Sequence, residues 1–254
     1  MKNTYRIGQI VPSSNTTMET EVPQILRNRQ TIRPESFTFH SARMRMKKVT
    51  KEELEAMDGE SIECARQLAD AAVDVIGYAC LVAIMSAGRG YHYESEEKLD
   101  KAVAGAGHPC PIVTSAGALV EVLQEMKCRT VSILTPYMQP LTKLVADYVE
   151  NEGVGVRHAI ALEIEDNLEV GRRDPMALLQ DVDRLDVEGV DAVVLSACVQ
   201  MPSLQAIERA QDKLGLPVVS AASCTTRVML KRLGLAPLSV GAGYALSEGF
   251  AQVR

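Results

Sequence analysis

The sequence contains no apolar run long enough to cross a membrane, since none approaches the ~20 residues that a spanning helix needs. Residues 1–5 (MKNTY) are polar and lack the core of a signal peptide. The net charge of −6 gives the chain little attraction for nucleic acid or for anionic membranes. We therefore expect a cytoplasmic protein that has neither nucleic acid nor a membrane as its partner.

Motifs for metals and other cofactors are also absent. None of the six cysteines belongs to a C-x-x-C pair, and no histidine pair has ligand spacing, which argues against a zinc site. The G-x-G elements at 105–107 and 241–243 lack the third glycine and the strand–helix context of a dinucleotide fingerprint. There is no G-x-S-x-G elbow, and no histidine is linked to a cysteine, which disfavours Ser- or Cys-based hydrolysis. We expect no cofactor and no metal.

What the chain does contain is an alternation of apolar, β-rich runs with amphipathic stretches. At 254 residues and 46% hydrophobic content, it can bury a sizeable core. The alternation is typical of the α/β class, in which helices connect the strands of a parallel sheet. We predict strands near residues 5–11, 35–41, 73–79, 111–114, 130–135, 156–162, 191–197 and 217–220.

The two halves of the chain resemble each other. Residues 6–12 (RIGQIVP) and 130–136 (TVSILTP) are both typical of a strand that ends in proline. Residues 111–116 (PIVTSA) and 217–222 (PVVSAA) each precede an amphipathic stretch. Two long units are too few for a solenoid. The order predicts a duplicated α/β unit, and the alternative is the loose repetition common to parallel-sheet proteins.

A duplication implies two pseudo-symmetric parallel-sheet lobes with a site at their interface. We predict that a helix over residues 115–127 carries the chain from the first lobe to the second. The segment after residue 220 should then return to the first lobe. The first lobe would comprise residues 1–115 and 222–254, and the second would comprise residues 116–221.

Two cysteines occupy matching places in the two halves. Cys80 ends the run 74–80 (DVIGYAC), and Cys198 ends the run 191–198 (DAVVLSAC). Each run is typical of a buried parallel strand, and ligands of open α/β sheets collect at the carboxyl ends of such strands. We therefore expect both thiols to face one cleft. A thiol can attack carbon as a thiolate and can move a proton near neutral pH, so the pair suggests cofactor-free chemistry at carbon.

Polar residues follow two other predicted strands. Asn15 lies in residues 13–19 (SSNTTME), where Thr16 and Glu19 fit a capping box. Asn15 is then either a helix-start residue or the donor of an amide to a ligand carboxylate, and a helix N-terminus is compatible with both roles. Tyr137 sits at the corresponding place of the second half, where it serves either packing or chemistry.

Three further features have simpler interpretations. Asp166 and Asn167 lie in a polar connection and are ordinary turn residues if they have no site role. The basic run 43–48 (RMRMKK) is interpreted as a solvated edge, because acidic residues follow it at 52–55. The remaining cysteines are interpreted as small packing residues: Cys64, Cys110, Cys128 and Cys224.

With its strand-end cysteines in duplicated α/β halves, the chain resembles the aspartate/glutamate racemase superfamily. The resemblance covers essentially the whole chain. Within the superfamily, residues 11–16 (VPSSNT), 77–82 (GYACLV) and 195–200 (LSACVQ) are similar to the maleate cis-trans isomerase family. Amino-acid racemases of the superfamily usually read Cys-Asn-Thr at the first cysteine and Cys-Thr followed by Glu or His at the second. This chain reads CLV at 80–82 and CVQ at 198–200, which is expected of the isomerase.

The resemblance implies cofactor-free isomerisation of maleate to fumarate, by thiolate addition to the double bond, rotation and elimination. It implies that Cys80 is the nucleophile, that Cys198 is the acid–base residue and that the chain is a homodimer. It assigns substrate binding to the side chains of Asn15, Tyr137 and Asn167 and to the backbone N–H groups of Leu81, Val82, Val199 and Gln200.

Cys80 needs help to ionise, because a free thiol is mostly protonated at neutral pH. We expect the N–H groups of Leu81 and Val82 and a helix terminus to favour its thiolate. Three alternatives stay open: an amino-acid racemase that uses both thiols for proton transfer, a malonate-type decarboxylase that would need one thiol, and a non-catalytic carboxylate-binding protein.

Overall fold

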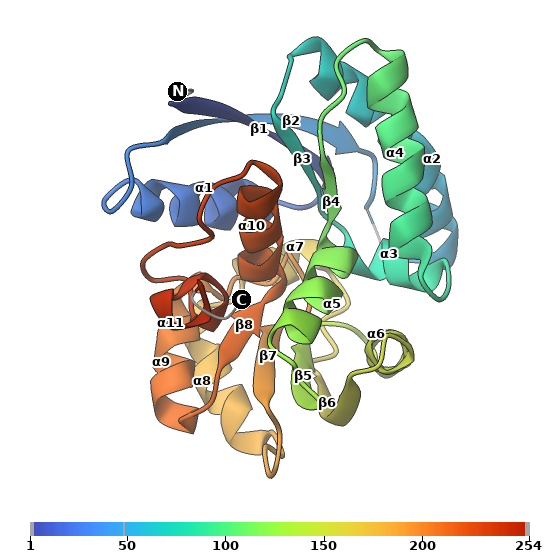
Figure 1. Ribbon diagram of the computed structural model, residues 1–254. Coiled ribbons are helices and arrows are strands. Elements are labelled where there is room, and N and C mark those ends of the chain that lie inside the picture. The colour runs from blue at the N-terminus through green and yellow to red at the C-terminus, as the bar shows by residue number, and fades with distance from the viewer. Residues whose placement is uncertain (1–2, 48, 252–254) are drawn as a thin grey trace.

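The computed structural model describes residues 3–47 and 49–251 and contains two four-stranded parallel sheets flanked by helices (Figure 1). Every predicted strand is found within a few residues of its predicted place. The strands are β1 (Thr4–Pro12), β2 (Ser36–Met44), β3 (Val75–Tyr78), β4 (Ile112–Thr114), β5 (Thr130–Thr135), β6 (Gly155–Ala161), β7 (Ala192–Ser196) and β8 (Val218–Ser220).

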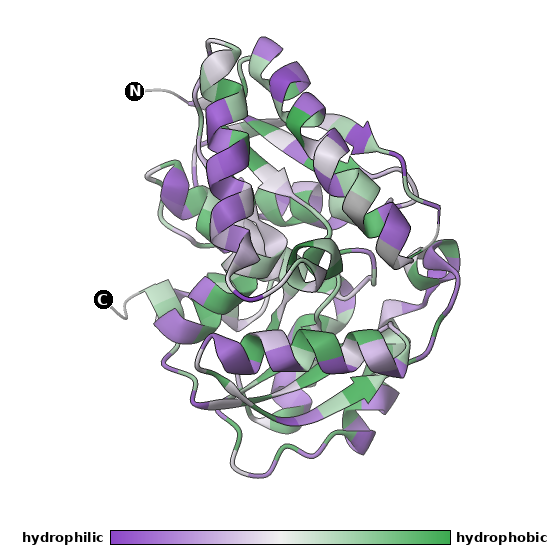
Figure 2. Ribbon diagram, turned by 90° about the vertical axis from the view of Figure 1, so that its right-hand side faces the viewer, coloured by the Kyte–Doolittle hydropathy of each residue, from purple (hydrophilic) through white to green (hydrophobic). Residues whose placement is uncertain are grey.

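Helices connect these strands and cover the sheets. Figure 2 shows hydrophilic residues gathered on their outer surfaces. The α-helices are α1 (Met18–Arg29), α2 (Lys51–Asp70), α3 (Leu81–Ser86), α4 (Tyr91–Gly105), α5 (Ser115–Glu125), α6 (Gln139–Asn151), α7 (Asn167–Arg172), α8 (Leu178–Asp181), α9 (Leu204–Leu214), α10 (Ala221–Arg232) and α11 (Glu248–Ala251). The 3₁₀ turns are η1 (Pro175–Ala177), η2 (Val182–Arg184) and η3 (Tyr244–Leu246). Within the described residues, none of the helices combines the length and the apolar character needed to cross a membrane.

The two sheets have the same strand order, as a duplicated α/β unit requires. The first sheet runs β2-β1-β3-β4 and the second runs β6-β5-β7-β8, with parallel pairing throughout. In each sheet the chain leaves the first strand toward one neighbour and later returns on its other side. Such a reversal opens a crevice at the carboxyl ends of the two central strands. Residues that follow β1, β3, β5 and β7 are therefore brought together.

Two of the central strands, β3 and β7, are buried over their whole length. All residues of β3 and β7 are buried, whereas most residues of the edge strands β2 and β6 are only partly buried or exposed. A parallel strand covered by helices on both faces needs apolar side chains on both faces, which is why these runs are continuously apolar. This burial fixes the strand ends, and the side chains that follow them, in place.

The chain crosses between the lobes through helices α5 and α10. Helix α5 ends at Glu125 instead of residue 127, because Lys127 takes a left-handed φ of 58° that stops the helix. Helix α10 packs against α1, β3 and α5, so this helix lies against the first sheet. A Cβ atom at Gly77 in β3 would lie 2.9 Å from Met229 Sδ of α10, so glycine permits this close packing. The lobe boundaries 1–115 plus 222–254 and 116–221 stay a prediction.

Candidate active site

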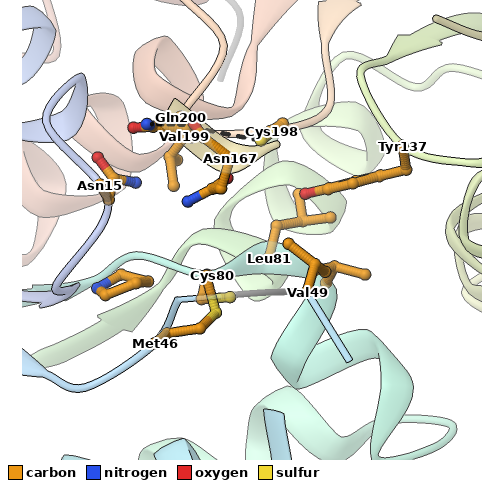
Figure 3. Close-up of a pocket in the computed structure, with 12 residues that line it drawn as sticks. Asn15, Met46, Val49, Cys80, Leu81, Tyr137, Asn167, Cys198, Val199 and Gln200 are labelled. Atoms are coloured by element: carbon orange, nitrogen blue, oxygen red, sulfur yellow. Dashed lines mark hydrogen bonds between the residues drawn. The ribbon is translucent and has the colours of Figure 1, made fainter. Parts of the chain in front are cut away.

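One pocket lies at the carboxyl ends of the central strands, between the loops of the two sheets (Figure 3). Every residue assigned from the sequence to catalysis or substrate binding lines it, and three further residues join them. The lining residues are Pro12, Asn15, Met46, Val49, Cys80, Leu81, Val82, Tyr137, Asn167, Cys198, Val199 and Gln200. The structure thus brings the assigned residues together, while their individual roles stay predictions.

Met46 and Val49 were missed because Met46 lies in the basic run 43–48, which the sequence suggested to be a solvated edge, and Val49 directly follows that run. The basic side chains of Arg45 and Lys47 are exposed, as expected, but the alternating positions 42, 44 and 46 are buried. This period-two alternation in residues 42–47 is the signal that could have revealed an inward face. The segment therefore turns charges to solvent and apolar side chains toward the pocket.

Arg43 also does more than occupy a solvated edge. Its guanidinium donates hydrogen bonds to the carbonyl oxygens of Ser13 at 2.9 Å and Asn15 at 2.7 Å, and it pairs with Glu19. These bonds fasten the β1–α1 loop to the end of β2, while the Arg43 side chain stays 38% exposed, as expected of a solvated edge. The last residue of the basic run, Lys48, lies outside the described residues.

Cys80 follows β3 and immediately precedes α3. It is 7% exposed, and its backbone has a φ of 130°, a value that residues other than glycine rarely adopt. Burial raises the pKa of its thiol to about 12, the backbone N–H of Ala83 opposes this rise, and nearby Cys198 adds to it. The donor to the sulfur is thus Ala83, and the expectation that Leu81 and Val82 provide it was wrong. Ala83 lies in the first turn of α3, so the donor does come from a helix terminus.

Cys198 follows β7 and has a richer set of donors. Burial raises the pKa of its thiol, whereas hydrogen bonds from the Tyr137 hydroxyl and from the backbone N–H groups of Gln200 and Met201 lower it. The Gln200 nitrogen lies 3.4 Å from Cys198 Sγ. The same environment raises the pKa of Tyr137 well above its usual value, because that side chain is buried and both thiols lie nearby. Tyr137 therefore stays protonated and acts as a donor.

The two thiols differ in how well their surroundings support a negative charge. Both are buried, which favours the neutral thiol. Three donors nevertheless favour ionisation of Cys198, and one favours ionisation of Cys80. A single negative charge on the pair of thiols is therefore better accommodated at Cys198.

The side-chain oxygen of Asn15 accepts a hydrogen bond at the N-terminus of helix α1. Its Oδ1 accepts the backbone N–H of Met18 at 3.1 Å, and its nitrogen is directed into the pocket (Figure 3). Helix α1 begins at Met18, so the capping box suggested for Thr16 and Glu19 was wrong. The N–H of Thr16 is instead bound by Gln200 Oε1 at 2.9 Å. The oxygen of Asn15 thus serves the helix while its nitrogen is available to a ligand.

Asn167 reaches the pocket from the other sheet as the first residue of α7. Asp166 caps this helix by accepting the N–H groups of Leu168 and Glu169, so Asp166 has a local structural role, whereas Asn167 lines the pocket. The Asn167 side-chain nitrogen donates to Ser14 Oγ at 2.8 Å. Its second N–H remains for a ligand, since an amide nitrogen carries two donors.

The pocket is small and its donors are neutral. Its volume is about 20 Å³, room for about one water molecule, so lining residues must move to admit a dicarboxylate. A second pocket of about 480 Å³ shares Val49, Tyr137 and Asn167 with it and opens beside it. Among the described residues that line the smaller pocket there is no Lys or Arg. Amides, a hydroxyl and backbone N–H groups must therefore hold any anion there.

A metal-based site finds no support in the residues present. Across residues 3–47 and 49–251, no group of three or more His, Cys, Asp or Glu side chains could hold a metal ion. The six cysteines lie within this part of the chain and are all free thiols. The chemistry available to the pocket is thus that of two thiols surrounded by hydrogen-bond donors.

Comparison with known proteins links this chain to characterised relatives. The family model described as arylmalonate decarboxylase matches residues 7–246. The maleate isomerase of Pseudomonas putida strain KT2440 is 58% identical over 250 residues, which cover 98% of this chain and 100% of the relative.

Solved structures agree with the sequence comparison. A cysteine-to-alanine variant of a maleate isomerase from another Pseudomonas putida strain, solved with maleate, superposes with a TM-score of 0.95 at 52% identity, covering 96% of this chain and 98% of that one. A cysteine-to-serine variant of the Nocardia farcinica maleate cis-trans isomerase carries a covalently bound succinylcysteine intermediate. It superposes with a TM-score of 0.92 at 42% identity, covering 96% of this chain and 98% of that one.

These relatives match the chain over nearly its whole length and share its two-lobed α/β fold. The level of identity is far above that at which only a fold is shared. With its two strand-end cysteines in a common pocket, this chain belongs to the maleate isomerase family.

Proposed function

We propose that this enzyme converts maleate to fumarate through covalent addition of Cys80 to the double bond. The observation that carries the proposal is the pair of cysteines, from β3 and β7, that line one pocket together with neutral amide donors. The succinylcysteine found in the Nocardia farcinica relative and the maleate bound to the Pseudomonas putida relative support this chemistry.

Covalent addition answers the main difficulty of the reaction. Rotation about a carbon–carbon double bond has a barrier well above the ~20 kcal/mol of a peptide bond. The bond must therefore become single during the reaction. A thiolate achieves this by conjugate addition, because the carboxylate on the far alkene carbon accepts the displaced electron pair.

The protons of the two thiols are used in sequence. The Cys198 thiolate, held by its three donors, takes the proton of Cys80 as the Cys80 sulfur bonds to one alkene carbon. The neutral Cys198 then protonates the neighbouring carbon and leaves a succinyl thioether on Cys80. After rotation about the new single bond, Cys198 removes that proton again, the carbon–sulfur bond breaks, and fumarate departs. The proton then returns from Cys198 to the Cys80 thiolate, which restores the starting state. No proton or electron is gained or lost overall.

The substrate carboxylates are held by neutral donors in this proposal. The nitrogens of Asn15 and Asn167 face the pocket from the two sheets (Figure 3). The N–H groups of Leu81, Val82, Val199 and Gln200 complete the set, together with the Tyr137 hydroxyl once protonation of Cys198 has freed it. Because such donors are fixed before the reaction, they can stabilise the enediolate that forms on addition, as an oxyanion hole does.

Maleate should convert to fumarate with no metal, nucleotide or flavin added, because two thiols and fixed donors are sufficient. The loss of maleate is followed by ultraviolet absorbance and by proton spectra, with and without a chelator. An unchanged rate with chelator is expected. Loss of activity on chelation, turnover of L- and D-aspartate but not of maleate, or binding of maleate with no product would contradict the proposal.

The Tyr137→Phe variant tests the proposed ionisation of Cys198. Removing the hydroxyl removes a hydrogen bond that lowers the Cys198 pKa, so that pKa should rise. Because the thiolate is the active form, kcat/KM should increase with pH, and this increase should move to higher pH in the variant. A bond to a charged group is worth about 1.5–3 kcal/mol, so the rate near pH 7 should fall roughly 10- to 150-fold.

The matched control for this experiment is Tyr148→Phe. Tyr148 is also buried, but its hydroxyl bonds the ring of His92 outside the pocket. This variant should keep the wild-type pH profile. If Tyr137→Phe lowers kcat/KM equally at every pH, the hydroxyl acts on the substrate and not on Cys198.

We also propose a cytoplasmic location, which six free cysteines support because disulfides are rare in that compartment. The homodimer implied by the resemblance belongs to the same proposal and is tested by light scattering. The division into lobes of residues 1–115 plus 222–254 and 116–221 is likewise proposed, and the packing of α10 on β3 supports it.

A further inference from the structure

We propose that the side chain of Gln200 is a positioning residue that sets the distance between the substrate-holding amides of Asn15 and Asn167. The inference rests on the proposed function, in which these two amides hold the carboxylates. It assigns to Gln200 a side-chain role separate from its backbone N–H group. We call this side chain, with the backbone groups that it binds, the Gln200 brace.

The amide of Gln200 is fully occupied by backbone partners. Its Oε1 accepts the N–H groups of Thr16 at 2.9 Å and Thr17 at 3.4 Å. Its Nε2 donates to the carbonyl oxygens of Ser14 at 3.0 Å and Asn167 at 2.9 Å. A side-chain amide has two donors and two acceptor positions, so none is left for substrate. Since N–H groups and carbonyls cannot exchange roles, these partners also fix which end of the amide is which.

These four bonds join three segments that are distant in the sequence. The β1–α1 loop carries Asn15, the start of α7 carries Asn167, and the loop after β7 carries Gln200 itself beside Cys198. The bond from Asn167 to Ser14 Oγ closes the arrangement. Gln200 is 3% exposed, so water does not compete for these bonds. Loops are the more mobile parts of a fold, and here one buried amide links them across the two sheets.

Gly171 in α7 supplies the space that the brace needs. A Cβ atom at this position would lie 2.4 Å from Gln200 Nε2 and 3.0 Å from its Cδ. The φ of Gly171 is not positive, so alanine suits the helical backbone and has the higher helix propensity. The atoms that a methyl group would meet first belong to the end of a flexible side chain. Gly171→Ala should therefore displace the Gln200 amide without unfolding the helix.

The experiment compares the wild type with Gly171→Ala, Gln200→Ala and the double variant, in kcat, KM and thermal unfolding. Gly59→Ala is the matched control, because Gly59 is also helical but has nothing within 4 Å of its Cβ position. A displacement of about 1 Å at a positioning group can cost roughly 100-fold. We expect kcat/KM to fall roughly 10- to 100-fold in both single variants, with a lower kcat and a higher KM. Gly59→Ala should match the wild type.

The double variant separates the brace from a general loss of stability. If Gly171→Ala acts only by displacing the Gln200 amide, it should cause no further loss once that amide is removed by Gln200→Ala. Losses in kcat/KM that add up in the double variant would overturn the brace. So would a lower unfolding temperature that accounts for the lost activity while kcat and KM of the folded protein are unchanged. Wild-type kinetics in both single variants would overturn it too. A wild-type protein that does not isomerise maleate would instead overturn the proposed function.

Discussion

Cys80→Ala should abolish the conversion of maleate and leave no covalent product on the protein. Without this sulfur no thiolate can open the double bond, and Cys198 cannot replace it, because its place in the mechanism is on the neighbouring carbon. A loss of at least about 10⁴-fold is expected, as for other enzymes that lose their nucleophile. Steady-state kinetics and intact-protein mass spectrometry after incubation with maleate measure the two effects.

Cys128→Ala is the matched control for Cys80→Ala. Cys128 has the same exposed fraction as Cys80, 7%, but lies outside the pocket, so Cys128→Ala should retain wild-type turnover. Thermal unfolding of both variants shows whether the fold is kept. A Cys80→Ala protein that still forms an adduct at Cys198 would exchange the roles of the two thiols. An adduct mapped to Cys64, Cys110, Cys128 or Cys224 would contradict the assignment of chemistry to the strand ends.

In the Cys198→Ala variant the succinyl thioether on Cys80 should accumulate, because the nucleophile remains while the acid–base group is gone. Losing such a group typically lowers rates by ~10²–10⁴-fold. Cys80 must then lose its proton to solvent, and the carbanion must take one from water. The later removal of that proton becomes slow, so the succinyl thioether is trapped.

Mass spectrometry should show a 1:1 addition of maleate to Cys198→Ala, and peptide mapping should place it on Cys80. The burial that raises the pKa of Cys80 to about 12 predicts faster adduct formation at higher pH in this variant, since more thiolate is then present. Full turnover with no adduct would show that Cys198 takes no part in proton transfer.

The local pattern of the sequence was sufficient to predict the strands and the positions of the two cysteines. Apolar runs marked the buried strands such as β3 and β7, because a strand buried on both faces admits few polar side chains. The same pattern placed Cys80 and Cys198 at strand ends. Local capping rules failed at residues 16–19, where a distant partner, Gln200, binds the backbone that the motif would have capped.

The sequence by itself determined the eight strands, their grouping into two related halves and the pair of strand-end cysteines, because burial and chain direction impose these locally. Only the tertiary structure decided which groups surround each thiol. Tyr137 reaches Cys198, and Met46 and Val49 enter the pocket, through contacts between segments far apart in the chain. The difference in ionisation between the two thiols therefore depends on how the backbone folds directly after each strand, which presents Ala83, Gln200 and Met201, and on the distant hydroxyl of Tyr137.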